Sequence, residues 1–173
     1  MFVPMTEDEF AEYVQAAIPE YARDKVASGQ WSEAESLSLS RKDYAELLPQ
    51  GIRTPDHLLY TLRDAATGGK VGVLWYACLE QAGRRLAYVY DILVYPEHQR
   101  QGHATRAFTL LAQEVRRRDL YGIALHVFGH NPGAKDLYEQ LGFKATSISM
   151  FKAVGSSTLV GKGPEAPHSD ISA

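Results

Sequence analysis

The chain has 173 residues, of which 45% are hydrophobic and 23% charged, the composition of one ordinary globular domain. Its formal net charge of −3 argues against binding of nucleic acid or of an anionic membrane, because such surfaces carry an excess of Lys and Arg. The single cysteine, Cys78, excludes an intramolecular disulfide. No apolar run reaches transmembrane length and the N-terminus lacks a signal-peptide pattern, so we expect a cytoplasmic protein.

The N-terminal third of the chain predicts a short edge strand and two helices. Residues 1–5 can form only a short strand, and residues 6–9 form a capping box that begins a helix. Pro19 lies inside this helical pattern and predicts a kink or break there. A second capping box, at residues 32–35, begins the next helix.

From His57 onward the pattern is typical of strands. Apolar segments joined by short glycine-containing links predict an antiparallel meander over residues 58–62, 71–79 and 86–94. A helix, a strand over 121–128, a helix beginning near Asn131 and a strand over 143–151 follow. We therefore expect an α/β fold with a mixed sheet and helices on both faces. We expect one domain over residues 1–153 and a flexible tail over 154–173.

The junction after the third strand of the meander suits an anion. The strand ends at Val94, and a polar loop with Gly102 leads into an amphipathic helix. Free N–H groups in the first helical turn, together with the helix dipole, attract phosphate. The loop is neither a Walker A loop nor a dinucleotide-binding turn. A polar loop with one glycine is, by itself, more often a plain connection.

Two motifs together resemble the GCN5-related N-acetyltransferases. Gln99-x-x-Gly102-x-Ala104 fits the loop with which that family holds the pyrophosphate of acetyl-CoA on backbone amides. The second hallmark of the family is matched by Asn131-x-x-Ala134-x-x-Leu137-Tyr138-x-x-x-Gly142-Phe143. The resemblance covers residues 70–152 and implies an acetyl-CoA-dependent N-acetyltransferase. It also implies N-terminal helices, a meander, and then strand–helix–strand–helix–strand with two splayed central parallel strands.

The resemblance also implies which residues hold acetyl-CoA, the acyl-donor cosubstrate. The backbone of Leu93 and Val94 would pair with the pantetheine arm, and Asn131 would hydrogen-bond this arm while capping its own helix. The cofactor-binding residues implied are Leu93, Val94, Gln99, Arg100, Gln101, Gly102, His103, Ala104, Thr105, Asn131, Lys135 and Tyr138.

Three residues are candidates for catalysis. Tyr138 matches the family tyrosine that protonates the departing thiolate, although core packing would explain it too. His126 stands where ribosomal-protein N-terminal acetyltransferases have a glutamate, and a core histidine is the alternative. Asp91 is the rival base, because a carboxylate in an apolar strand needs a partner or a raised pKa. Whether any base is needed stays open. We expect no metal, since His126 and His130 lack a third ligand at a suitable spacing.

The acceptor is the least determined part of the function. Tyr13, Tyr21 and Trp31 line its site or belong to the core. A polyamine, an amino sugar, an antibiotic amine or a peptide N-terminus would each fit, and so would transfer of a longer acyl group. A non-catalytic acyl-CoA sensor or interaction module is the alternative to an enzyme, and a homodimer stays open.

Overall fold

The computed structural model describes residues 1–152 and 154, so the predicted flexible tail lies outside the described residues except for Val154. The chain divides into two compact units. The first comprises Met1–Ala16 and Tyr44–His126, and the second comprises Ala17–Asp43 and the chain from Val127 onward. The single domain over 1–153 stays a prediction. Within the described residues, no helix has the length and apolar character needed to cross a membrane.

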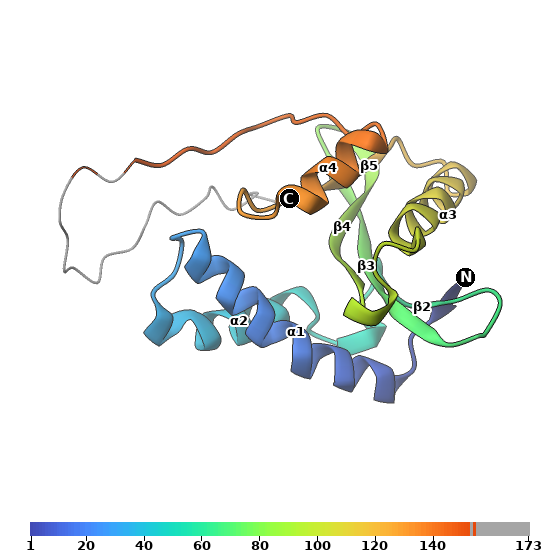
Figure 1. The fold of residues 1–173 in the computed structure, drawn as a ribbon, viewed down its shortest axis with the longest axis horizontal. Coiled ribbons are helices and arrows are strands. Elements are labelled where there is room, and N and C mark those ends of the chain that lie inside the picture. The colour runs from blue at the N-terminus through green and yellow to red at the C-terminus, as the bar shows by residue number, and fades with distance from the viewer. Residues whose placement is uncertain (153, 155–173) are drawn as a thin grey trace. The chain divides into compact units, whose positions relative to one another are not determined.

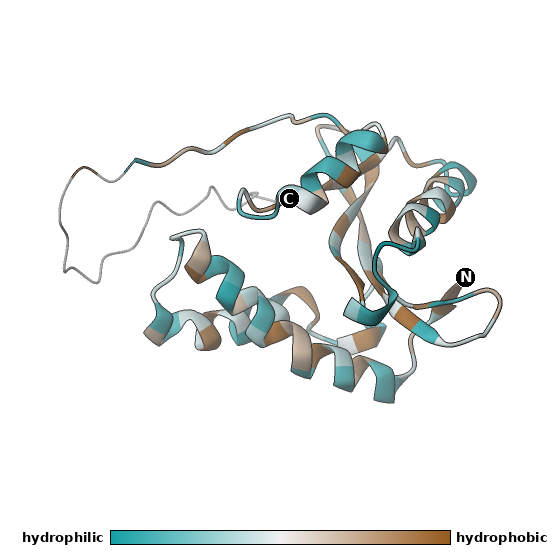
Figure 2. Cartoon of the chain, in the orientation of Figure 1, coloured by the Kyte–Doolittle hydropathy of each residue, from teal (hydrophilic) through white to brown (hydrophobic). Residues whose placement is uncertain are grey.

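A five-stranded mixed sheet lies in the first unit (Figure 1). The first four strands pair antiparallel and the last pairs parallel to the fourth, which confirms the predicted mixed fold with its meander. The central strand is buried over residues 71–78, and Figure 2 shows apolar residues along the middle of the sheet. The strands, in their order across the sheet, are β1 (Phe2–Pro4), β2 (His57–Arg63), β3 (Lys70–Gln81), β4 (Arg84–Val94) and β5 (Ile123–Leu125).

The described residues form four α-helices and two short 3₁₀ helices. They are α1 (Glu7–Ala27), α2 (Glu33–Leu47), η1 (Gly51–Arg53), η2 (Pro96–His98), α3 (His103–Arg117) and α4 (Pro132–Gln140). The prediction of a break at Pro19 is wrong, because α1 continues through it to Ala27. Proline removes only one donor, and packing supports the helix there, since the Ser40 hydroxyl of α2 donates to the Ile18 carbonyl at 2.8 Å.

Helices cover both faces of the sheet. The apolar stripe of α3 is buried on the face toward β4, through Ala107, Phe108, Leu111 and Val115. The opposite face carries Thr61, Trp75 and Asp91, since Thr61 pairs with Val73 and Asp91 pairs with Trp75. The beginning of α1 lies over this second face, where Glu9 contacts Thr61.

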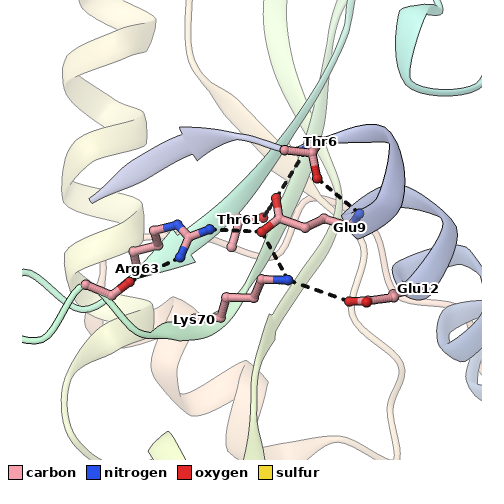
Figure 3. Close-up of polar contacts among 7 residues, drawn as sticks. Thr6, Glu9, Glu12, Thr61, Arg63 and Lys70 are labelled. Carbon is pink, nitrogen blue, oxygen red and sulfur yellow. Dashed lines mark hydrogen bonds and ion pairs between the residues drawn. The ribbon is translucent and has the colours of Figure 1, made fainter.

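Glu9 fastens the start of α1 to the sheet (Figure 3). It completes the predicted capping box with Thr6, each residue's side chain accepting from the other's backbone N–H. Its carboxylate also accepts from the Thr61 hydroxyl at 2.8 Å and pairs with Arg63 at 2.9 Å and Lys70 at 3.1 Å. Burial raises the pKa of Glu9, but the hydrogen bonds from Thr6, Thr61 and Lys70 outweigh burial and lower the pKa to about 2.

Two predicted strands differ from the structure. The strand over 121–128 is shorter, because only Ile123–Leu125 pairs with β4. The strand over 143–151 is wrong, because these residues have no regular secondary structure. A strand forms only beside a neighbour that pairs its backbone groups and covers its side chains. Here Ile148, Met150 and Phe151 are 77%, 91% and 75% exposed.

Candidate active site

β4 loses its parallel neighbour part-way along its length. The two strands pair at Ala87 with Ile123, Tyr88 with Ala124, and Val89 with Leu125. Beyond Val89 no described strand pairs with β4 on that side, although β4 continues over residues 90–94. Leu93, in this stretch, is 41% exposed. This end of the parallel pairing agrees with the predicted splay of the two central strands and leaves a strand edge that another extended chain can pair with.

A β-bulge lies at the point where β5 ends. Trp75 of β3 pairs with Asp91 and the next residue, Tyr76, pairs with Val89, so Tyr90 is an extra residue in β4. An extra residue in one strand shifts the alternation of side chains beyond it. Asp91 therefore lies on the same face as Tyr90, although the two are consecutive. Without the bulge it would point to the opposite face.

The loop after β4 has the backbone of an anion site. The loop begins after η2. Its residues Arg100 and Gly102 have positive φ angles, of 61° and 78°. A Cβ on Gly102 would approach Arg106 only to 3.9 Å, so its backbone conformation, and not lack of space, favours glycine. Gly102 is the N-cap of α3, and the backbone N–H groups of residues 102–105 donate to no described atom. Such free amides at a helix N-terminus attract phosphate.

Side-chain hydrogen bonds fix the shape of this loop. Gln99 Nε2 donates to the Val94 carbonyl at 3.0 Å, and Gln101 Nε2 donates to the Glu97 carbonyl at 3.2 Å. The Arg106 guanidinium donates to the Gln101 carbonyl at 2.6 Å. His103 is 9% exposed at the first position of α3, where Ala104 and Thr105 follow. The predicted loop residues therefore lie together beside the end of β4.

Asp91 has the partner that its place in an apolar strand requires. The Tyr13 hydroxyl, from α1, donates to its carboxylate at 2.8 Å. Burial raises the pKa of Tyr13 well above its usual value, and the charge of Asp91 raises it further. Burial and the same charge raise the pKa of Tyr44. Both phenols therefore remain protonated at neutral pH, and the Tyr13 hydroxyl is the one that donates to the Asp91 carboxylate.

The remaining predicted residues belong to the second unit or to its boundary. Asn131 caps α4, accepting from the Ala134 N–H at 3.0 Å, as predicted for an N-cap. Lys135 is exposed and lies 3.5 Å from Glu139. Tyr138 is half-buried, with its ring 5.7 Å from that of Phe143.

The structure thus groups the predicted residues in two sets. One set, in the first unit, consists of Asp91, the end of β4 and the loop after it. The other, in the second unit, lies on α4 and its cap. His126 is exposed, directly after β5. Among the described side chains, no three His, Cys, Asp or Glu residues are grouped so that they could hold a metal ion.

Comparison with known proteins identifies the family. The profile of the acetyltransferase (GNAT) family matches residues 15–143. The chain belongs to the GNAT family. The uncharacterised N-acetyltransferase YycN of Bacillus subtilis (strain 168) is 35% identical over 152 residues, 88% of this chain and 97% of YycN. A second uncharacterised N-acetyltransferase of that strain, YdgE, is 29% identical over 148 residues, 86% of this chain and 94% of YdgE.

The same relationship holds in three dimensions. The crystal structure of Bacillus subtilis YycN superposes with a TM-score of 0.85, at 34% sequence identity, and the match covers 90% of this chain and 99% of that one. The family and the fold expected from the two motifs are therefore confirmed, and the chain is an acetyltransferase by family.

Sequence reasoning missed an aromatic cluster next to Asp91 in this GNAT protein. Trp75 stacks on Tyr90 with ring centroids 4.6 Å apart, and its Nε1 donates to His57 Nδ1 at 3.0 Å. Tyr88 meets Tyr90 at 64°, with centroids 5.0 Å apart. The aromatic residues of β4 were visible in the sequence. The bulge that gathers them beside Asp91 was not, because no residue type in β4 requires it.

Proposed function

We propose that the chain is an N-acetyltransferase that moves the acetyl group of acetyl-CoA to a primary amine by direct attack in a ternary complex. One observation carries this proposal: β4 has an edge on the side of β5 that no described strand pairs with beyond Val89, and η2 joins this stretch to a loop with free backbone amides. The strand edge at Leu93 and Val94 suits the pantetheine arm, whose amides pair like those of a strand. The amides of residues 102–105 suit the pyrophosphate. The remaining donors proposed for the cofactor are Gln99, Arg100, Gln101, Asn131 and Lys135.

The proposed chemistry needs few protein groups. The neutral amine attacks the thioester carbonyl carbon, the C–N bond forms, and the C–S bond breaks. A backbone N–H at the end of β4 would stabilise the oxyanion. The departing thiolate takes a proton from Tyr138, and the amine loses its proton to Asp91, to His126 or to solvent. The acceptor would be an amine on a small molecule or at a peptide N-terminus.

An amine panel tests the activity. The protein is incubated with acetyl-CoA and polyamines, amino sugars, antibiotic amines and short peptides, while free CoA thiol and product mass are followed. An acetyltransferase releases thiol and forms an amide with at least one amine. An acyl-CoA sensor would bind acetyl-CoA by calorimetry and release no thiol. Longer acyl-CoA donors in the same assay define the acyl preference.

Tyr138→Phe tests the proposed acid. The substitution keeps nearly all of the ring and deletes the hydroxyl. We expect kcat to fall at least about a hundredfold, because a positioned general acid contributes roughly 10²–10⁴ in rate. Acetyl-CoA affinity and melting temperature should change little. A variant that turns over within a few-fold of the wild type, in an assay limited by chemistry, would show that the ring only packs.

A further inference from the structure

The side chains of Tyr88 and Tyr90, both in β4, form what we call the aromatic corner. The planes of the two rings are inclined at 64° to each other. Tyr90 is backed by Trp75, whose ring is nearly parallel to it at 18°, and by His57 at 5.5 Å. Tyr88 contacts only Tyr90 among the described rings. The Tyr90 ring is therefore supported by the rings packed against it, whereas the Tyr88 ring is supported by Tyr90 alone. The corner lies at the strand position where β5 stops pairing.

The polar groups of this corner have no hydrogen-bond partner among the described residues. Both rings are half-buried, yet the hydroxyls of Tyr88 and Tyr90 form no hydrogen bond with any described residue. Neither hydroxyl is among the buried polar atoms of the described residues that lack a partner, so both are open to solvent and can form hydrogen bonds with a ligand. Burial raises the pKa of both tyrosines, so both are neutral phenols at pH 7.

The His57 ring packs in the same cluster, and its surroundings favour the uncharged form. Its Nδ1 accepts a hydrogen bond from Trp75 Nε1, so the proton of the neutral ring is on Nε2. Burial lowers the pKa of His57, which works against a positive charge beside the corner. Asp91 lies on the same face, two residues beyond Val89 in the bulged strand. The surroundings therefore combine aromatic faces, neutral hydroxyls and one carboxylate, without a competing cation among them.

We propose that the aromatic corner receives the acceptor, and that it selects an amine which arrives as an aliphatic ammonium ion. This inference rests on the proposed acetyl transfer and names the class of amine that the site takes. Aromatic faces attract ammonium groups, the phenol oxygens accept its N–H bonds, and the Asp91 carboxylate favours positive charge. Aromatic amines, which are uncharged at neutral pH, can still donate an N–H to a phenol oxygen, but they lack the positive charge that the aromatic faces and the carboxylate attract.

Tetramethylammonium is the probe, because it is a cation that can be neither acetylated nor hydrogen-bonded. In the wild type it should raise the KM of an accepted amine without changing kcat at saturating amine. Tyr88→Leu removes one ring and should weaken both the amine and tetramethylammonium about three- to tenfold. Tyr88→Phe deletes only the hydroxyl, so it should weaken the amine and leave tetramethylammonium inhibition unchanged. Tyr121→Leu, at an exposed tyrosine of the same unit, is the matched control.

The outcomes separate this inference from the proposed activity. If no amine is acetylated, saturation-transfer NMR of tetramethylammonium on the wild type and Tyr88→Leu still tests the corner. Loss of the NMR signal in Tyr88→Leu but not in Tyr121→Leu supports it. Absence of tetramethylammonium binding to the wild type overturns it, as does equal binding to the folded Tyr88→Leu and Tyr121→Leu variants. If Tyr88→Leu unfolds, Tyr90→Phe must weaken the amine and spare tetramethylammonium, and the opposite result refutes the inference.

Discussion

Substitution of Glu9 by Gln should destabilise the protein by an amount that depends on pH. The carboxylate is 9% exposed; burial raises its pKa, but the hydrogen bonds from Thr6, Thr61 and Lys70 outweigh burial and lower the pKa from 4.5 to about 2. At about 1.4 kcal/mol for each pKa unit, this corresponds to about 3 kcal/mol of folding free energy. Arg63 and Lys70 are 29% and 39% exposed, so solvent screening reduces the expected loss to about 2 kcal/mol.

The sign of the pH dependence follows from the lowered pKa. A carboxyl group that is more acidic in the folded protein stabilises it above its unfolded pKa. That contribution is lost as the pH falls from about 5 toward about 2. Glutamine can still cap the helix and bond Thr61, but it leaves Arg63 and Lys70 without their shared carboxylate. The difference between wild type and Glu9→Gln should therefore be about 2 kcal/mol at pH 7 and shrink toward pH 3.

Urea unfolding followed by circular dichroism, at several pH values between 7 and 3, measures this difference. Glu35→Gln is the matched control, because Glu35 also holds the N3 position of a capping box, and among the described residues its carboxylate accepts only one hydrogen bond, an exposed one from the Ser32 hydroxyl at 2.7 Å. It should cost no more than about 0.5 kcal/mol. A loss in Glu9→Gln that is equally small, or that does not change with pH, would refute the electrostatic account of the network.

Three further variants probe the proposed site. Gly102→Ala places a side chain on a residue with φ of 78°, where space is free; we expect a stability loss of about 1 kcal/mol by urea unfolding and weaker acetyl-CoA binding by calorimetry. Unchanged affinity would remove the loop from the cofactor site. For the base, kcat/KM is measured against pH for Asp91→Asn and His126→Gln, and the variant that lacks the base should lose the rising acid limb. If both keep it, the amine loses its proton to solvent.

Local signals explain why so much of the fold was predictable. Capping boxes are decided by residues three apart, and both helices begin where their boxes place them. The Asn131 cap formed for the same reason, as asparagine followed by proline suits a helix start. The loop around Gly102 was predictable because its motif, Gln99-x-x-Gly102-x-Ala104, is a short stretch of chain with fixed spacing.

Features that depend on neighbouring strands were not predictable. Residues 143–151 alternate enough to read as a strand, yet strand formation requires a partner that a single segment does not specify. The bulge at Tyr90 is of the same kind, because it is a mismatch between two strands and not a property of either. Both faces of β4 carry residues that tolerate burial, so alternation alone would have placed Asp91 on the face toward α3.

The close approach of β3 to the end of β4 connects the fold with the proposed cofactor edge. A Cβ on Gly72 would lie 2.0 Å from the Leu93 carbonyl oxygen. Because this oxygen belongs to the backbone, only a movement of the backbone can remove the clash. Gly72→Ala must therefore push β4 outward at Leu93 and Val94, at a cost of about 1–3 kcal/mol. Gly122→Ala, in the same unit with open space around it, is the control. If pantetheine pairs with this edge, acetyl-CoA affinity should fall in Gly72→Ala and not in Gly122→Ala. A folded Gly72→Ala protein with unchanged affinity would mean that the cofactor pairs elsewhere, even though the strand ends where the family pattern predicts.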